Sequence, residues 1–179
     1  MRLLILDRDG VINQDSDEFI KSPEEWIPIP GSLPAIARAN QLGYRVVVTS
    51  NQSGLARGLF DLGQLNKIHA HMLSEVARFG GRIEAVFFCP HGPHDGCACR
   101  KPLPGLLLDL GTRLNVDWKS AIVVGDRESD MLAANAVGAQ KILVKTGHGK
   151  QALEKTKTIP SITVCNDLAS AVDQLATIQ

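Results

Sequence analysis

The chain opens on the stretch Leu3-Leu4-Ile5-Leu6-Asp7-Arg8-Asp9-Gly10, an unbroken apolar run followed by two acidic residues and a glycine. A run without polar alternation predicts a strand buried on both faces, as in a parallel sheet, and ligands of such sheets bind at the carboxyl ends of strands. Residues two apart on extended chain share a face, so we expect the Asp7 and Asp9 carboxylates to need a divalent cation, Mg²⁺ above all. The alternative is a solvated glycine turn.

Further apolar runs alternate with segments of helical periodicity along the rest of the chain. This alternation predicts βαβ units and therefore a doubly wound α/β fold, with a mostly parallel sheet covered by helices on both faces. We expect one domain over residues 1–179, without a large cap domain. The expected strands are 3–6, 45–49, 85–88, 121–124, 141–144 and 162–164, and the expected helices are 32–42, 61–79, 103–114, 130–136, 149–155 and 169–176.

The composition narrows the class of protein. The 179 residues are 44% hydrophobic and 21% charged, with 19 basic and 19 acidic side chains, so the charge balance does not favour nucleic-acid binding. No apolar stretch approaches the roughly 20 residues that span a bilayer, and the N-terminus enters a strand at once. We therefore expect a cytoplasmic protein that does not act at a membrane.

Polar groups also follow three later segments of the predicted core. The sequence Thr49-Ser50-Asn51-Gln52-Ser53-Gly54 offers hydroxyl and amide groups for phosphate oxygens, although such residues also cap helices. Arg100-Lys101-Pro102 places two cations at a helix start, or else forms a solvated basic pair. In Gly125-Asp126-Arg127-Glu128-Ser129-Asp130, Asp126 is the natural further metal ligand, whereas Asp130 could equally cap the following helix.

A second group of potential metal ligands lies in the segment 89–99. Cys89, Cys97 and Cys99 occur there with His91 and His94, and three thiols so close together suit a metal better than disulfides in a reducing compartment. Three thiolates and one imidazole make the ligand set of a closed, structural zinc site. The residues alone leave open whether His91 or His94 completes it.

The chain resembles the haloacid dehalogenase (HAD) phosphatases. Their four motifs have counterparts here in the same order: Asp7-Arg8-Asp9-Gly10, Ser50, Lys101, and Gly125-Asp126 with Asp130. The stretches Asn51-Gln52-Ser53-Gly54-Leu55-Ala56-Arg57-Gly58 and 89–102 are similar to the heptose-bisphosphate phosphatase branch, which is close to histidinol phosphatase. The resemblance implies a HAD-like Rossmannoid fold and a phosphomonoester hydrolase. It also favours His91 as the fourth zinc ligand.

The resemblance further implies residue roles. Asp7 would be the nucleophile and Asp9 the general acid and base, while Ser50 and Lys101 would hold the phosphoryl oxygens. Mg²⁺ would be bound by Asp7, Asp9 and Asp126, and Zn²⁺ by Cys89, His91, Cys97 and Cys99. The substrate-binding residues would be Asp15, Ser16, Asp17, Glu18, Asn51, Gln52, Ser53, Arg57, Arg100 and Arg127.

The expected reaction is hydrolysis of the 7-phosphate of D-glycero-D-manno-heptose 1,7-bisphosphate, giving heptose 1-phosphate for lipopolysaccharide synthesis. The partner would then be a small sugar bisphosphate, with no nucleic acid involved, and the chain would act as a monomer. Histidinol phosphate is the alternative substrate; a polynucleotide 3′-phosphatase and a zinc-loop nucleic-acid-binding module are remoter alternatives. Arg127 stands where relatives often have Lys, and the loop 14–19 lacks their Gly-Tyr pair, which leaves sugar recognition open.

Overall fold

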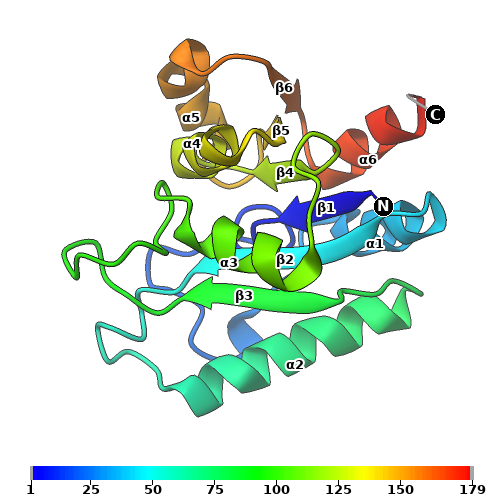
Figure 1. Ribbon diagram of the computed structural model, residues 1–179. Helices are drawn as coiled ribbons and strands as arrows, with labels where there is room; N and C mark the ends of the chain where they lie inside the picture. The colour runs from blue at the N-terminus through cyan, green and yellow to red at the C-terminus, as the bar shows by residue number, and fades with distance from the viewer. Residues whose placement is uncertain (1, 178–179) are drawn as a thin grey trace.

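The computed structural model describes residues 2–177 and contains a six-stranded parallel sheet (Figure 1). The strand order is β3-β2-β1-β4-β5-β6, so the chain winds outward from β1 in both directions. The prediction of a doubly wound α/β fold is confirmed. The strands are β1 (Leu3–Leu6), β2 (Arg45–Asn51), β3 (Ala85–Cys89), β4 (Ile122–Gly125), β5 (Gln140–Val144) and β6 (Ile162–Cys165).

Within residues 2–177, six α-helices cover the sheet, three on each face. One core cluster joins Leu4, Leu6 and their strand neighbours to α1, α2 and α6, and two further clusters join Ile5, Leu143 and others to α3, α4 and α5. Alternate residues of the central strands face opposite layers, which is why these strands are apolar throughout. The helices are α1 (Ser32–Gln41), α2 (Leu62–Arg78), α3 (Gly105–Leu114), α4 (Glu128–Val137), α5 (Gly149–Lys155) and α6 (Leu168–Thr177).

The strands all end on one side of the molecule. The arrowheads of β1, β3 and β4 point the same way in Figure 1. Between β1 and β4 the strand order reverses direction, and open α/β sheets bind ligands in the crevice at such a switch point. Asp7 follows β1 and Asp126 follows β4, so both carboxylates lie at this crevice.

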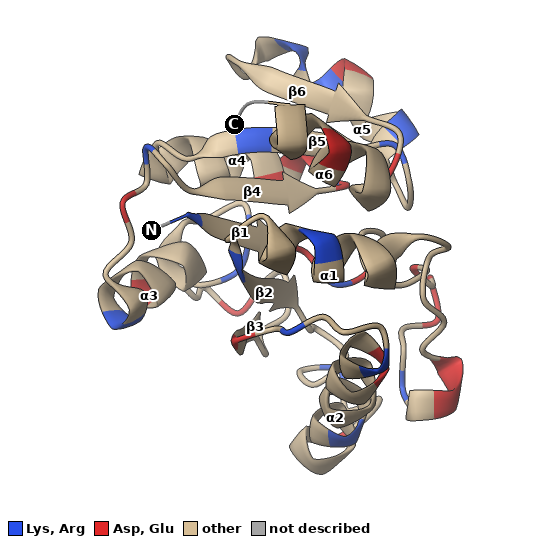
Figure 2. Ribbon diagram, turned by 90° about the vertical axis from the view of Figure 1, so that its right-hand side faces the viewer, with Lys and Arg blue, Asp and Glu red and all other residues tan. Residues whose placement is uncertain are grey.

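The connections at this end are loops rather than a second folded unit. Between β1 and α1 the chain forms only the short 3₁₀ helix η1 (Pro23–Glu25). Basic and acidic segments are interspersed along the ribbon (Figure 2). Within residues 2–177, none of the helices combines the length and the apolar character that crossing a membrane requires.

Most element bounds agree with the sequence prediction, and two differences have a local cause. α4 begins at Glu128 rather than at 130, because the Asp130 carboxylate accepts the backbone N–H of Arg127 (3.0 Å) and so starts the helix earlier. β2 continues to Asn51 because β3 pairs with it as far as Cys89.

Candidate active site

Three carboxylates form a buried cluster at the switch point. One oxygen from each of Asp7, Asp126 and Asp130 lies within 4.8 Å of the others. The backbone N–H of Asp7 donates to the Val124 carbonyl (2.9 Å), which continues the β1–β4 pairing past the end of β1 and fixes where Asp7 lies. All three carboxylates are almost fully buried, so water does little to screen their mutual repulsion.

Lys101 is the cation that faces this cluster. Its Nζ lies 2.9 Å from Asp7 Oδ1 and 2.6 Å from Asp130 Oδ1, and it also donates to the Thr49 carbonyl at 3.0 Å. Only 4% of Lys101 is exposed. Asp130 therefore has two functions in this structure: one oxygen caps α4 and the other holds Lys101.

The cluster is short of positive charge. Burial raises the pKa of Asp7 well above its usual range, and Lys101 offsets this only in part. Burial, reinforced by Asp130, raises the pKa of Asp126 to about 7. Burial opposes the charge on Lys101, but Asp130 and Asp7 together outweigh it and raise the pKa of the ammonium group. One ammonium thus faces three carboxylates, an arrangement that a divalent cation would stabilise.

The surroundings of Asp126 fit such a cation. Its Oδ2 accepts the backbone N–H of His148 (2.7 Å), whereas its buried Oδ1 has no hydrogen-bond partner. A Cβ atom on Gly10 or on Gly147 would overlap the Asp126 carboxylate, so both positions need glycine for this close approach. A hard metal ion is the ligand that an unpartnered buried carboxylate oxygen suits.

Asp9 is arranged differently from the simple expectation of two paired carboxylates. The chain bends after β1, and the Asp9 side chain turns to Arg8, Asn13 and Gln52 instead of joining the buried cluster. Asp7 is therefore paired with Asp126 and Asp130 rather than with Asp9. Asp9 nevertheless lines the same pocket as Asp7.

The residues that follow β2 divide into two kinds. Ser50 is buried and lines the pocket beside Asp7. The Asn51 side chain holds the backbone of Lys101, since its Oδ1 accepts the Lys101 N–H (3.1 Å) and its Nδ2 donates to the Lys101 carbonyl (3.0 Å). The Asn51 side chain thus fixes the segment that carries Lys101; Asn51 also lines the pocket, and its binding of substrate stays a prediction.

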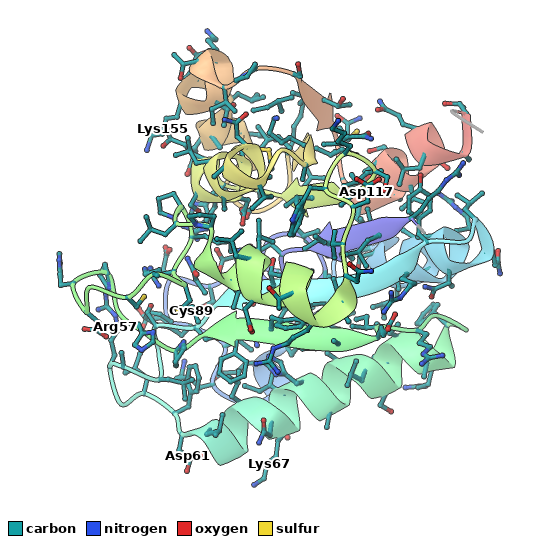
Figure 3. The ribbon with its side chains drawn as sticks, viewed as in Figure 1. Arg57, Asp61, Lys67, Cys89, Asp117 and Lys155 are labelled. Carbon is teal, nitrogen blue, oxygen red and sulfur yellow. The ribbon has the colours of Figure 1, made fainter. Side chains whose placement is uncertain are left out.

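A pocket of about 460 Å³ opens above the carboxylates. Most of the residues predicted for catalysis and substrate binding line this pocket, but Glu18 and Arg57 do not, and the predicted metal ligand Asp126 is buried outside its lining. Glu18 is exposed, and Arg57 stacks 5.5 Å from the centroid of the Phe19 ring, which itself lines the pocket. In Figure 3, Arg57 and Cys89 lie toward the carboxyl ends of the strands. The predicted residues that line the pocket are Asp7, Asp9, Asp15, Ser16, Asp17, Ser50, Asn51, Gln52, Ser53, Arg100, Lys101 and Arg127.

Two of the residues expected to contact substrate are paired with each other. Arg127 Nη2 lies 2.6 Å from Asp15 Oδ2, and His148 Nε2 lies 3.1 Å from the same oxygen. Asp15 thus fastens the loop after β1 to the loop that supports Asp126. Arg127 and Arg100 line the wall of the pocket together with Lys101, and the fourth cationic residue of the lining, Arg8, is paired with Asp9.

The thiol cluster lies at the carboxyl end of β3. The Sγ of Cys89 is 3.1 Å from that of Cys99 and 3.7 Å from that of Cys97, and His91 Nδ1 is 3.3 Å from Cys99 Sγ. The four side chains form one group of potential metal ligands, and none of the cysteines is in a disulfide. His91, not His94, belongs to this group.

Sequence reasoning left Asp130 undecided and gave Arg8 no function. Arg8 is fully buried and pairs with Asp9. The sequence did contain a signal for this pairing, namely an arginine between two acidic residues. An arginine is readily buried only when an acidic group pairs with it.

Comparisons with known proteins agree with this geometry. A family model described as HAD-hydrolase-like matches residues 98–171. The chain is 53% identical over 175 residues to the D-glycero-β-D-manno-heptose-1,7-bisphosphate 7-phosphatase of Bordetella bronchiseptica, covering 98% of each chain. It is 51% identical over 174 residues to the enzyme of that name from Pseudomonas aeruginosa, covering 97% of each.

Solved structures give the same result. The crystal structure of D,D-heptose 1,7-bisphosphate phosphatase from B. bronchiseptica, complexed with magnesium and phosphate, matches with a TM-score of 0.97 at 52% identity over the full length of both chains. That of the Burkholderia thailandensis enzyme matches with a TM-score of 0.79 at 40% identity over 99% of each chain. The protein therefore belongs to the heptose-1,7-bisphosphate 7-phosphatase family of HAD-like hydrolases.

Proposed function

We propose that this chain removes the 7-phosphate of D-glycero-β-D-manno-heptose 1,7-bisphosphate and releases heptose 1-phosphate for envelope polysaccharide synthesis. The observation that carries the proposal is the buried cluster of Asp7, Asp126 and Asp130 facing Lys101 at the base of an open pocket. The names of the close relatives supply the substrate and its anomer.

In the first step, Asp7 acts as the nucleophile. One of its carboxylate oxygens attacks phosphorus, the bond from phosphorus to the sugar O7 breaks, and Asp9 donates a proton to that oxygen. Lys101 lies 2.9 Å from Asp7 Oδ1, so its charge is placed where the phosphoryl group arrives. Ser50 and Lys101 would stabilise the negative charge on the equatorial oxygens.

In the second step, the aspartyl phosphate is hydrolysed. Asp9 takes a proton from a water molecule, and the water oxygen attacks phosphorus. The bond between phosphorus and the Asp7 oxygen breaks, which frees the Asp7 carboxylate and releases inorganic phosphate as the second product. Asp9 returns to its starting protonation state once it has given one proton and taken one. Dividing one displacement into two lowers the barrier of each.

We propose that Mg²⁺ is held by side-chain oxygens of Asp7 and Asp126 and by the backbone carbonyl of Asp9. The unpartnered Asp126 oxygen and the excess of negative charge support this assignment. When bound, the ion would offset the electrostatic repulsion between the anionic phosphoryl group and the carboxylates. The B. bronchiseptica relative was crystallised with magnesium and phosphate.

We propose a structural Zn²⁺ at Cys89, His91, Cys97 and Cys99. Four protein ligands leave no position for substrate, so the ion would stabilise the loop 89–99 rather than take part in chemistry. Burial raises the pKa of the Cys89 thiol to about 12, with the Cys99 contact adding to the effect. A bound cation would favour the thiolate that this environment disfavours.

For the rest of the substrate, we propose that Arg100 and Arg127 bind the distal phosphate and that Asp15, Ser16 and Asp17 contact sugar hydroxyls. These residues line the pocket. Asn51, Gln52, Ser53, Glu18 and Arg57 complete the set expected from the sequence, although Arg57 and Glu18 lie outside the pocket lining. We further propose that the chain is a single-domain, monomeric, cytoplasmic enzyme that acts on a small molecule and not on nucleic acid.

A panel of phosphate esters tests the proposal. Released phosphate is measured with Mg²⁺ for both anomers of the heptose bisphosphate, for histidinol phosphate and for a short 3′-phosphorylated oligonucleotide. We expect kcat/KM for the β-bisphosphate to exceed that of every other ester at least about tenfold, equivalent to roughly 1.4 kcal/mol of differential transition-state binding. A higher value for histidinol phosphate or for the oligonucleotide would overturn the substrate assignment.

A further inference from the structure

Gln52 contacts three groups of the site at once. Its Nε2 lies 2.7 Å from Ser50 Oγ and 3.0 Å from Asp9 Oδ2, and its Oε1 lies 3.3 Å from Arg8 Nη2. The side chain is buried, with 4% of the residue exposed, and its backbone N–H donates to the Cys89 carbonyl at 2.8 Å. All the hydrogen-bonding positions of the amide nitrogen are therefore occupied by protein.

The neighbours determine which way the amide points. Arginine can only donate hydrogen bonds, so the side facing Arg8 must be the Gln52 oxygen. The amide nitrogen then faces Asp9 and Ser50 with its two N–H groups. A reversed amide would place nitrogen against Arg8 and oxygen against the Asp9 carboxylate, and both contacts would be repulsive.

This orientation sets the polarity of the Ser50 hydroxyl. Because Gln52 donates to Ser50 Oγ, Ser50 acts as the acceptor in that bond and its own proton remains available. Ser50 is 1% exposed and lines the pocket. Its proton is then available to donate toward the pocket, where a phosphoryl oxygen needs a donor.

The same amide also fixes Asp9. The Asp9 carboxylate accepts from Arg8 Nε and Nη2 (3.0 Å each), from Asn13 Nδ2 (2.9 Å) and from Gln52 Nε2. Arg8 and Asn13 belong to the same segment as Asp9, whereas Gln52 comes from the end of β2. Gln52 is thus the group that ties Asp9 to the phosphate-binding Ser50.

We infer that Gln52 is a positioning residue: through one buried amide it makes Ser50 a hydrogen-bond donor to the transferring phosphoryl group and holds Asp9 beside the leaving oxygen. The inference rests on the functions proposed above for Ser50 and Asp9. It replaces the expectation that Gln52 contacts the sugar, because both N–H groups of the amide are already donated to Asp9 and Ser50.

The test compares Gln52→Glu with Ser50→Ala and with the double variant. Glutamate has the shape of glutamine but cannot donate, so Ser50 would donate to it and lose its proton for the substrate. Two substrates are used with Mg²⁺: the heptose bisphosphate, and p-nitrophenyl phosphate, whose leaving group needs no proton. Gln52→Met serves as a second variant without added charge, and Gln174→Glu, exposed on α6, is the matched control.

With p-nitrophenyl phosphate we expect Gln52→Glu to lower kcat/KM by at least about tenfold, a fraction of the 10²–10³ that one preorganised donor can supply. The double variant should then be no slower than Ser50→Ala alone. With the heptose bisphosphate the loss should be several-fold larger, because Asp9 is displaced as well. Methionine offers Ser50 no strong acceptor, so Gln52→Met should lose less than Gln52→Glu with p-nitrophenyl phosphate but should still lose more with the heptose bisphosphate than with the aryl substrate, because Asp9 is released. Gln174→Glu should match the wild type.

Two results would overturn the inference. One is full additivity of the Gln52 and Ser50 substitutions on the aryl substrate. The other is a rise in KM for the bisphosphate with kcat unchanged, as expected of a residue that binds sugar. Asp7→Asn is assayed in parallel. If Asp7→Asn stays active, the proposed function fails. If Asp7→Asn is inactive and either of the two results above is found, only the function inferred for Gln52 fails.

Discussion

The two clusters of metal-ligand side chains are built in opposite ways. The acidic cluster takes Asp7 and Asp126 from the ends of the two central strands and Asp130 from the start of α4, and all three are almost fully buried. The thiol cluster takes all four residues from one segment, 89–99, and only Cys89 is fully buried.

The difference indicates which of the two clusters would need a bound metal for its structure. Sheet pairing and the buried cation Lys101 hold the acidic cluster in place, so a metal there serves chemistry. The thiol cluster has no cation among its ligands and lies in a loop, so a metal there would supply the folding energy of that loop. The two are joined by a short stretch, because Lys101 follows Cys99 by two residues.

The largest effect should come from Asp7→Asn. Loss of the nucleophile should lower phosphate release by at least about 10⁴-fold, the scale seen when a covalent nucleophile is removed. The melting temperature should not fall, because the raised pKa of Asp7 means that its charge costs folding energy at neutral pH. Enzyme assay and thermal melting of the same preparation measure both. An active variant would remove Asp7 from the chemistry.

Lys101→Met should have the opposite effect on stability. It leaves Asp7 and Asp130 without their cation, and breaking a buried ion pair by removing one partner costs about 3–5 kcal/mol. The kcat should also fall by about 10²–10³-fold, because one preorganised donor is lost. Arg100→Met is the control, since Arg100 is less buried and makes no ion pair with the cluster. Equal melting temperatures for the two variants would show that Lys101 does not support the acidic cluster.

Cys99→Ser should separate the two clusters. The bound zinc per chain and the melting temperature should fall together, while kcat falls less than in Lys101→Met, because Asn51 still holds the Lys101 backbone. Metal analysis and thermal melting provide the measurements, with Cys165→Ser as the control, since Cys165 belongs to β6 and lies outside the thiol cluster. Unchanged zinc content in Cys99→Ser would disprove the structural site.

The smallest effect concerns pH. The pKa of Asp126 is about 7 in the fold against an ordinary 3.8, so the stability it contributes is fully present below about pH 4 and is lost as pH rises through 7. Without Mg²⁺, the melting temperature of the wild type should therefore fall relative to Asp126→Asn between pH 5 and pH 8. We expect a relative fall of at least about 3 °C, given about 2–4 °C per kcal/mol at this size.

Adding Mg²⁺ at pH 8 should restore the wild type and leave Asp126→Asn little changed, because the ion replaces the proton that the carboxylate has lost. If the melting temperatures of the wild type and of Asp126→Asn change with pH in the same way, Asp126 carries no unfavourable charge in the folded protein.

Much of the fold could be predicted because its signals are local. Apolar runs and helical periodicity predicted each described strand and α-helix to within two or three residues, but not the short 3₁₀ helices at Pro23–Glu25 and Thr156–Thr158. The predicted strand ends indicated Asp7 and Asp126. The contacts within the site could not be predicted in the same way. Gln52 meets Asp9 across 43 residues and Lys101 meets Asp7 across 94, so these pairs depend on the order of the strands. Sequence identifies such groups but not the direction in which each one points.

The split between strand ends and loops has a consequence for evolvability. Asp7 and Asp126 directly follow β1 and β4 at the centre of the sheet, whereas the outer walls of the pocket include the loop at 15–20 and Arg100, which take no part in the proposed bond breaking. Insertions or exchanges in those walls can redirect the enzyme to another phosphorylated metabolite while leaving the bond-breaking apparatus intact. The substrate specificity of this fold can therefore change while the catalytic residues stay the same.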